Sequence, residues 1–415
     1  MAADVADVVI VGAGAIGGWA SYFARAAGAE RVVVVERDVA GYGASSRAAG
    51  IVRAQGGTEA TVRLGRWSID FYKRQASLLG TDSGFRELGY LLLATSEAEV
   101  RAGRERVEMQ RALGLDVEWL DAPEATARCV VLAPEGHAGG SYLASDGAID
   151  PPRNVRAYLL AMQQTGVELR ERTPCIGLRT STTSEGARVE GVDTPSGTIA
   201  TRNVVLTGGP GLRALGELAG LRIPVGGARH QVAVTEPDPA FDVERMPMVF
   251  DVGAGLYWRL EEGGLLFGMS NPTEAPGPAR AVDWDYLGRM RERLGRLVPV
   301  TRGLELRKVW AATIDYTPDH LPIIGPGVKP EGERIAGLTV ASAGGHGMMW
   351  GPAVAAAAAD LALTGRSDVV DCDPLGLDRF DESGRSRLAT DPIALPFPVA
   401  ADDALAGADA SGSDL

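Results

Sequence analysis

Three glycines near the N-terminus, Gly12, Gly14 and Gly17, follow an apolar run and have the spacing G-x-G-x-x-G. This spacing is typical of a strand-to-helix turn that binds the pyrophosphate of a dinucleotide. The first glycine allows a tight turn, the second lets the backbone approach the phosphates, and the third lets the helix pack against the strand. The N–H groups and dipole at the start of that helix favour negative charge. The sequence therefore predicts a dinucleotide site here.

A second apolar run, residues 31–35, ends at Glu36. An acid about 20 residues beyond the glycines is placed to accept a hydrogen bond from a ribose hydroxyl. Glu36 favours an adenosine with a free 2′-hydroxyl, and Arg37 beside it leaves a phosphorylated ribose as the less favoured alternative. The complete strand–helix–strand pattern argues against an accidental glycine turn.

The loop over residues 38–53 is rich in small residues and carries Ser45, Ser46, Arg47 and Arg53. It follows the second strand, at the edge where open α/β sheets bind ligands. Its backbone can lie against a flat cofactor, while the two arginines offer bidentate contacts to anions. The alternative interpretation is a surface loop, with Arg53 in a structural ion pair.

A second glycine-rich turn, residues 344–352, leads into an alanine-rich helix and contains His346. The start of such a helix can stabilise negative charge on a ligand, although a purely structural turn is the alternative. The other histidines, His137, His230 and His320, are interpreted as structural or surface residues.

Several elements must position these residues. Apolar periodicity predicts helices over 61–79, 97–113, 151–166 and 284–297, and strands over 167–178, 203–207, 305–313 and 335–341, with a hairpin over 188–200. Residues 221–268 have the pattern of an antiparallel sheet. Because the strand at 203–207 is apolar and ends in glycines like the first, we expect the chain to return there to the first sheet.

Composition narrows the class of protein. The 415 residues, 45% of them hydrophobic, can form a large core, and the net charge of −13 argues against nucleic-acid or anionic-membrane partners. Cys129, Cys175 and Cys372 lack metal-site spacing, which disfavours a metal site or a disulfide framework. We find no signal peptide or membrane span and expect a cytoplasmic location. Residues 401–415, poor in large apolar side chains, are expected to be disordered.

In order along the chain, these motifs resemble those of the FAD-dependent D-amino acid oxidase superfamily, in the branch of the sarcosine oxidases and dimethylglycine dehydrogenases. Further matches are the stretch Asp146–Pro151, Thr317–Asp319 and the following Pro322–Gly325. The resemblance covers roughly residues 5–375 and implies an α/β fold. The implied fold has a discontinuous Rossmann-type FAD-binding domain (1–80, 140–220 and 315–375), an antiparallel-sheet substrate domain (81–139 and 221–314) and a C-terminal extension (376–415).

The resemblance also implies which residues bind FAD and substrate. Those expected to bind FAD are Gly12, Gly14, Ala15, Ile16, Glu36, Arg37, Ser45, Ser46, Arg47, Ala49, Gly50, Cys175, Gly208, Gly345, His346, Gly347 and Met348. Those expected to act on the substrate are Arg53, Tyr257, Arg259, His346 and Met349. Arg53 matches the arginine that binds the substrate carboxylate in this family.

Departures from the family pattern are informative. Ala312 and Arg47 stand where relatives carry the cysteine or the histidine that attaches the flavin, so non-covalent FAD is expected. Leu266 replaces a lysine that promotes reaction with oxygen, which favours a dehydrogenase over an oxidase. Met349 replaces a second lysine that binds the carboxylate.

The implied activity is oxidation of the C–N bond of an amino acid or N-alkyl amine by hydride transfer to flavin, with O2 or another electron acceptor. One alternative is an FAD-dependent 2-hydroxy acid dehydrogenase. Another is the flavin subunit of a hetero-oligomeric amine dehydrogenase. A homo-oligomer or a partner subunit is compatible with both.

Overall fold

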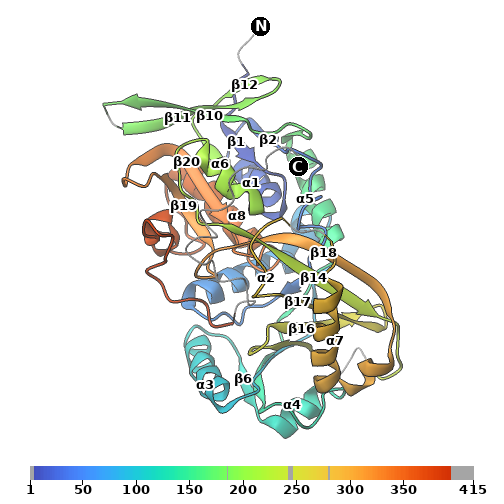
Figure 1. Cartoon of the computed structure of the whole chain (residues 1–415). Coiled ribbons are helices and arrows are strands. Elements are labelled where there is room, and N and C mark those ends of the chain that lie inside the picture. Colours follow the sequence, from blue (N-terminus) through green and yellow to red (C-terminus); the bar gives the residue numbers. More distant parts are fainter. Residues whose placement is uncertain (1–3, 185, 242–245, 279–280, 394–415) are drawn as a thin grey trace.

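Two large sheets, one mostly parallel and one mostly antiparallel, organise the chain (Figure 1). This computed structural model describes residues 4–184, 186–241, 246–278 and 281–393. The tail segment 401–415, expected to be disordered, lies outside the described residues. Figure 1 shows the parallel sheet with α1 and α8 in the upper part of the molecule and the antiparallel sheet with α7 in the lower part.

The first sheet has the strand order β10-β11-β20-β13-β1-β2-β9, with β12 beside β11 and β19 beside β20. Its strands are β1 (Val8–Val11), β2 (Val32–Val35), β9 (Glu168–Arg170), β10 (Gly177–Thr183), β11 (Gly186–Thr194), β12 (Gly197–Ala200), β13 (Val204–Leu206), β19 (Ile323–Val328) and β20 (Arg334–Ser342). β1 pairs in parallel with β2 and β13. The chain therefore returns to this sheet, as the glycine-ended run at 203–207 predicted.

β1 is buried on both faces, which is typical of a strand in a covered parallel sheet. Val8 and Ile10 belong to the core on one face, and Val9 and Val11 belong to the core on the other. The first of these cores packs under helices α1 (Ala15–Ala26), α2 (Glu59–Leu79), α5 (Pro151–Thr165) and α8 (Gly351–Thr364). The second core lies beside the short helix α6 (Leu212–Glu217).

The second sheet has the order β18-β14-β17-β16-β15-β5-β7-β6. Its strands are β5 (Tyr90–Leu93), β6 (Glu118–Leu120), β7 (Gly140–Leu143), β14 (Gly226–Thr235), β15 (Met248–Asp251), β16 (Leu256–Glu261), β17 (Gly264–Ser270) and β18 (Leu306–Tyr316). Helix α7 (Trp284–Leu297) packs its apolar face on this sheet, close to α4 (Ala122–Arg128). Helix α3 (Glu97–Ala112) lies beside β6 and β7. A small third sheet joins β3 (Ile51–Val52), β8 (Gly147–Ala148) and β4 (Arg86–Glu87).

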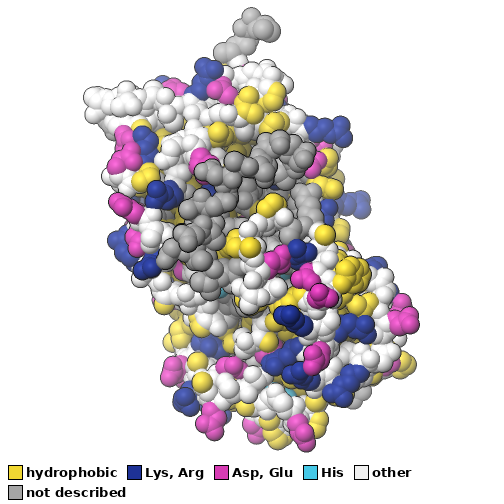
Figure 2. Space-filling view, in the orientation of Figure 1, with side chains coloured by type: hydrophobic (Ala, Val, Ile, Leu, Met, Phe, Trp, Pro, Cys, Tyr) yellow, Lys and Arg dark blue, Asp and Glu magenta, His cyan; other side chains and the backbone are white. Residues whose placement is uncertain are grey.

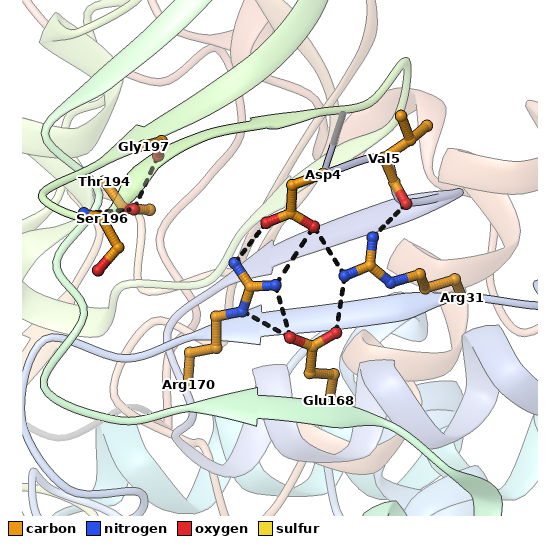
Figure 3. Close-up of polar contacts among 8 residues, drawn as sticks. All are labelled: Asp4, Val5, Arg31, Glu168, Arg170, Thr194, Ser196 and Gly197. Atoms are coloured by element: carbon orange, nitrogen blue, oxygen red, sulfur yellow. Dashed lines mark hydrogen bonds and ion pairs between the residues drawn. The ribbon is translucent and has the colours of Figure 1, made fainter. Parts of the chain in front are cut away.

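Four charged side chains tie three segments together at one edge of the first sheet (Figure 3). Arg31 and Arg170 each contact both Asp4 and Glu168, with nitrogen-to-oxygen distances of 2.5–2.8 Å. Hydrogen bonds from Arg170 and Arg31 lower the pKa of the Asp4 carboxyl. The cluster joins the segment before β1 to β2 and β9, and its partial exposure makes its contribution to stability modest.

Two expectations need correction. The strand expected over 167–178 is broken between Glu171 and Ile176, because this segment crosses the end of β2. Arg172 N–H and Thr173 N–H donate to the carbonyl oxygens of Asp38 and Glu36 there, and Arg172 has a φ of 51°. The domain boundary expected at residue 140 belongs after Leu143, because β7 pairs with β5 and β6 in the second sheet.

Charged side chains of both signs are interspersed on the face of the molecule in Figure 2. No helix among the described residues is sufficiently long and apolar to cross a bilayer.

Candidate cofactor and substrate site

The glycine turn lies between the end of β1 and the start of α1, as its spacing predicted. Gly12 has a φ of +103°, which favours glycine, and a methyl group on Gly17 would lie 1.9 Å from the Gly12 carbonyl oxygen. The Glu36 carboxylate accepts hydrogen bonds from Ala13 N–H (2.8 Å) and Asp38 N–H (2.9 Å). The acid therefore lies at the glycine turn, beside the position where a ribose would follow the phosphates.

The loop over residues 41–50 is held from both sheets. Ala15 N–H, at the start of α1, donates to Ser45 Oγ at 2.9 Å. From the second sheet, Trp310 Nε1 donates to the Arg47 carbonyl at 2.8 Å, and Arg259 Nε donates to the Ala49 carbonyl at 2.7 Å. These contacts fix the backbone of the loop between the two sheets.

The second glycine turn follows β20 and precedes α8. The carboxyl of Asp315 supports it, because Ser342 Oγ donates to Asp315 at 2.6 Å and also accepts from Gly344 N–H. His346 Nδ1 lies 3.0 Å from the Gly344 carbonyl oxygen. Burial and the nearby Arg53 guanidinium lower the pKa of His346 to about 3, so its ring is neutral near pH 7.

Arg53 lies at the start of a buried polar network. Its side chain is 3% exposed and donates to the Gln55 carbonyl and, at 2.9 Å, to the Ile393 carbonyl. Gln55 Nε2 donates to Asp146, which also accepts from Ala54 N–H. Burial raises the pKa of the Asp146 carboxyl to about 7, although these hydrogen bonds act to lower it.

Tyr257 and His230 form a hydrogen-bonded pair on the second sheet. The Tyr257 hydroxyl lies 2.5 Å from His230 Nε2, and His230 Nδ1 lies 2.8 Å from Ser270 Oγ. Burial lowers the pKa of His230 to about 4 and raises that of Tyr257. Both side chains are therefore neutral at pH 7, and the imidazole can accept a hydrogen bond from the phenol.

One cavity of about 1400 Å³ joins these parts. Part of the cavity is lined by the first glycine turn and the acid beside it, Gly12, Gly14 and Glu36. The part beside the second glycine turn, Gly345–Met349, is lined by Arg53, His230 and Tyr257. The glycine turn, the loop and the second glycine turn therefore face a single space between the two sheets.

A family model described as "FAD dependent oxidoreductase" matches residues 7–361. The chain belongs to this family of FAD-dependent oxidoreductases. The resemblance to the sarcosine oxidase branch is confirmed, because the similar proteins include sarcosine, dimethylglycine and glycine oxidoreductases.

Two curated relatives illustrate the range of similarity. The chain is 30% identical over 385 residues to glycine oxidase of Geobacillus kaustophilus, covering 90% of this chain and 97% of that one. It is 27% identical over 369 residues to the formaldehyde-forming 4-methylaminobutanoate oxidase of Paenarthrobacter nicotinovorans, covering 86% of this chain and 43% of the relative. The chain thus spans less than half the length of several curated relatives that it matches, this oxidase among them.

Solved structures show the same fold. L-proline dehydrogenase from P. horikoshii has a TM-score of 0.81 at 24% identity, covering 90% of this chain and 97% of that one. Glycine oxidase from Geobacillus kaustophilus has a TM-score of 0.76 at 28% identity, covering 90% and 98%. The predicted α/β class, with a Rossmann-type domain and an antiparallel-sheet domain, is confirmed.

The residues present fit FAD. The space beside Gly12 and Gly14 admits backbone approach to phosphates, the start of α1 favours their charge, and Glu36 lies where a ribose hydroxyl would donate. The cavity continues from there along the 41–50 loop to the turn at Gly345–Met349. Its volume of about 1400 Å³ and its lining suit a dinucleotide with a flat ring system.

The structure brings most of the predicted residues to this cavity. Those that line it are Gly12, Gly14, Ala15, Ile16, Glu36, Arg37, Ser45, Arg47, Ala49, Gly50, Arg53, Cys175, Gly208, Tyr257, Gly345, His346, Gly347, Met348 and Met349. Ser46 and Arg259 instead line a second pocket, on the other side of the loop. Arg259 is engaged there by Glu261 at 2.6 Å and by the Ala49 carbonyl, so its role is to hold the loop.

Sequence reasoning missed several residues of the cavity, His230, Tyr90 and Ile393 among them. His230 was interpreted as structural, yet it pairs with Tyr257 in the cavity wall. The alternation His230, Val232, Val234 along β14 places the histidine on the face of the sheet that carries Tyr257, and this alternation was a signal for it. Tyr90 and Ile393 also line the cavity, and no motif marks either of them.

Proposed function

We propose that this chain oxidises the C–N bond of an amino acid or N-alkyl amine. The observation that supports this most strongly is the shared cavity. A buried arginine, Arg53, and a neutral hydrogen-bonded pair, Tyr257 and His230, face the same space as the FAD-binding turns. Bound FAD supplies the hydride acceptor for this chemistry.

The residues of the chain supply binding and orientation, and they exclude water. Arg53 attracts a substrate carboxylate, because its guanidinium is buried and retains N–H donors beyond those given to Gln55 and Ile393. The Tyr257 hydroxyl donates to neutral His230, so its oxygen can accept a hydrogen bond from the N–H of a neutral substrate amine and orient the carbon that gives up a hydride. Met348 and Met349 add apolar surface that excludes water.

The relatives agree with this class of reaction. The names of several describe oxidation of glycine, sarcosine or methylaminobutanoate. In this chain Leu266, 2% exposed, occupies the position of the lysine that promotes reaction with oxygen, so we propose an acceptor other than O2. Ala312 and Arg47 lack the groups that attach flavin in relatives, and we propose that FAD is held non-covalently.

The remaining parts of the proposal concern the setting of the enzyme. The discontinuous domain division, with the boundary at residue 140 moved to follow Leu143, rests on the sheet pairing. Cytoplasmic location rests on three free cysteines, as reducing compartments keep thiols unpaired. A partner chain is suggested by one relative named as a subunit, sarcosine oxidase subunit beta of Rhodobacter capsulatus.

The deciding experiment is a visible absorption spectrum of the purified protein without oxygen, before and after addition of N-methyl, D- and L-amino acids. Bleaching of the flavin bands supports the proposal, and readmission of air separates an oxidase from a dehydrogenase. Bleaching by 2-hydroxy acids alone would instead select the hydroxy acid dehydrogenase, whose substrate hydroxyl the Tyr257 oxygen is equally placed to bind. An oxidised flavin that no member of the panel bleaches would reject the proposal for the isolated chain.

A further inference from the structure

A short C-terminal segment, Asp391–Ile393, forms part of the cavity wall. Ile393 is 1% exposed and packs in a core cluster with Tyr90, Phe250 and Tyr257. It also lines the large cavity, beside Arg53 and Tyr257. The family model ends at residue 361, so this wall comes from a part of the chain beyond the family match.

The backbone of the segment is bonded to the arginine that faces the substrate. Arg53 Nη2 donates to the Ile393 carbonyl at 2.9 Å, and Ile393 N–H donates to Asp391 Oδ1 at 2.9 Å. The Ile393 carbonyl thereby accepts a hydrogen bond from one guanidinium N–H, and this bond fixes the orientation of the Arg53 guanidinium. The Asp391 side chain in turn fixes the backbone that carries this carbonyl.

Close packing keeps the segment in place. A methyl group on Gly57 would lie 2.1 Å from Asp391 Oδ1 and 2.7 Å from Pro392 Cδ, so glycine is needed where the two segments meet. Asp391 N–H donates to the Asp319 carbonyl at 3.0 Å. Asp319 itself forms a buried ion pair with Arg379, with Nε to Oδ2 at 2.7 Å.

A buried carboxyl, Asp391, and a half-buried arginine, Arg106, interact beside the segment. Asp391 is 3% exposed, and its Oδ2 has no hydrogen-bond partner in the described part of the chain. Arg106, on α3, has a buried Nε that likewise lacks one there. Burial and then the charge of Arg53 lower the pKa of Arg106, while Asp391 opposes that shift. The charge of Asp391 thus offsets that of Arg106 beside this segment.

Resting on the proposed function, we propose that Ile393 is a specificity-determining residue: its carbonyl orients Arg53, and its side chain sets the room for the substrate beside Tyr257. Substrates with a carboxylate and a small substituent fit beside Ile393, and larger substituents meet its side chain. The carbonyl contact is independent of the side chain, so substitution of Ile393 changes the size limit and leaves the anchoring of Arg53 intact.

The test uses full-length holoenzyme with Ile393→Ala, the smaller change Ile393→Val, and the matched control Leu388→Ala. Leu388 lies just before this segment, is half-buried and does not line the cavity. Flavin absorbance first establishes that each variant is folded and loaded. Dissociation constants for aliphatic carboxylates, from acetate to 4-methylpentanoate, are then measured from the change in the flavin spectrum, which needs no turnover.

In Ile393→Ala we expect the affinity ratio of 4-methylpentanoate to acetate to rise by about tenfold or more, with a smaller rise in Ile393→Val and none in the control. An unchanged ratio in both Ile393 variants, or an equal rise in Leu388→Ala, would overturn the inference while the proposed function stands. If wild type binds carboxylates with the expected size limit but no amine bleaches the flavin, the proposed function fails and the inference about Ile393 is retained. If wild type binds no carboxylate, the inference about Ile393 fails, and the bleaching experiment alone decides the proposed function.

Discussion

Gly268 and Tyr257 face one another on neighbouring strands, and the absence of a side chain on the glycine makes room for the tyrosine ring. A methyl group on Gly268 would lie 2.1 Å from the Tyr257 hydroxyl. The ring crosses β17 at this gap, and its hydroxyl reaches His230 on β14, 2.5 Å away. The pair that we assign to orientation of the substrate nitrogen therefore depends on a glycine in the strand between its members.

Gly268→Ala is expected to displace the Tyr257 ring and break its hydrogen bond to His230. Loss of this aligned hydrogen-bond acceptor for the substrate nitrogen lowers kcat by about tenfold or more, with FAD retained, because the glycine lies on β17 and not at the phosphate-binding turn. Stopped-flow measurement of flavin bleaching by substrate checks this. The matched control is Gly288→Ala on the exposed face of α7, where an added methyl group meets nothing. Equal bleaching rates in Gly268→Ala and wild type would contradict the assignment.

Arg53→Ala removes the buried guanidinium that we assign to the substrate carboxylate. Loss of a desolvated charge pair costs roughly 2–5 kcal/mol, which corresponds to an increase in KM of about thirtyfold or more for amino acids. Amines without a carboxylate should show a much smaller change. Steady-state kinetics with one substrate of each kind checks the difference, and Arg101→Ala, on the exposed side of α3, serves as the control. A KM that rises equally for both substrates would show a structural role only.

His346 should make stability depend on pH. Its pKa falls from 6.5 to about 3 in the folded protein, so between these values the unfolded chain binds the proton more tightly. Stability from this residue is therefore present above about pH 6.5 and is lost as the pH falls, by up to about 1.4 kcal/mol per pH unit. Asp146 opposes this trend, because its pKa is raised to about 7 in the folded state.

The comparison of wild type with His346→Asn cancels the contribution of Asp146. We expect the difference in the free energy of unfolding between the two proteins to shrink as the pH is lowered from 6.5 to 5, measured by urea denaturation of each. A difference that stays constant over this range would mean that the folded and unfolded states bind the His346 proton equally well.

The buried ion pair between Arg379 and Asp319 should contribute strongly to folding. Both side chains are at most 4% exposed, and Arg379 also donates to the carbonyls of Leu375 and Leu321. Asp319→Asn leaves a buried guanidinium without its charge partner and is expected to cost about 3–5 kcal/mol. Glu59→Gln, which breaks an exposed pair with Arg63 on α2, should cost less than about 1 kcal/mol. Denaturant unfolding of both variants checks the contrast, and equal losses would argue against it.

The cofactor half of the site was predictable because local pattern determines it. Glycine spacing after an apolar run defines the turn at Gly12–Gly17, and the end of the next apolar run places Glu36 beside it. These features need only the geometry of one strand–helix–strand unit, which adjacent residues specify.

The substrate half was less predictable because it depends on register between strands and on close approach. Tyr257 reaches His230 only through the pairing of β14, β16 and β17, and a shift of one residue would turn either side chain to the other face. Arg259 shares the face of Tyr257 by alternation, yet it lies on the other side of the 41–50 loop, bonded to it. The contact of Arg53 with Ile393 spans 340 residues and has no signature in local sequence.

The strand order of the first sheet has a consequence for synthesis of the chain. β1 is enclosed by β2 on one side and by β13 and then β20 on the other, and these partners end at residues 35, 206 and 342. The 41–50 loop also requires Trp310, from β18. The cofactor-binding turn is synthesised before these partners, so its supporting strands are complete only after β20 has been made. Assembly of the FAD site therefore requires synthesis through β20, and a chain interrupted before β20 would have an exposed apolar strand and no cofactor site.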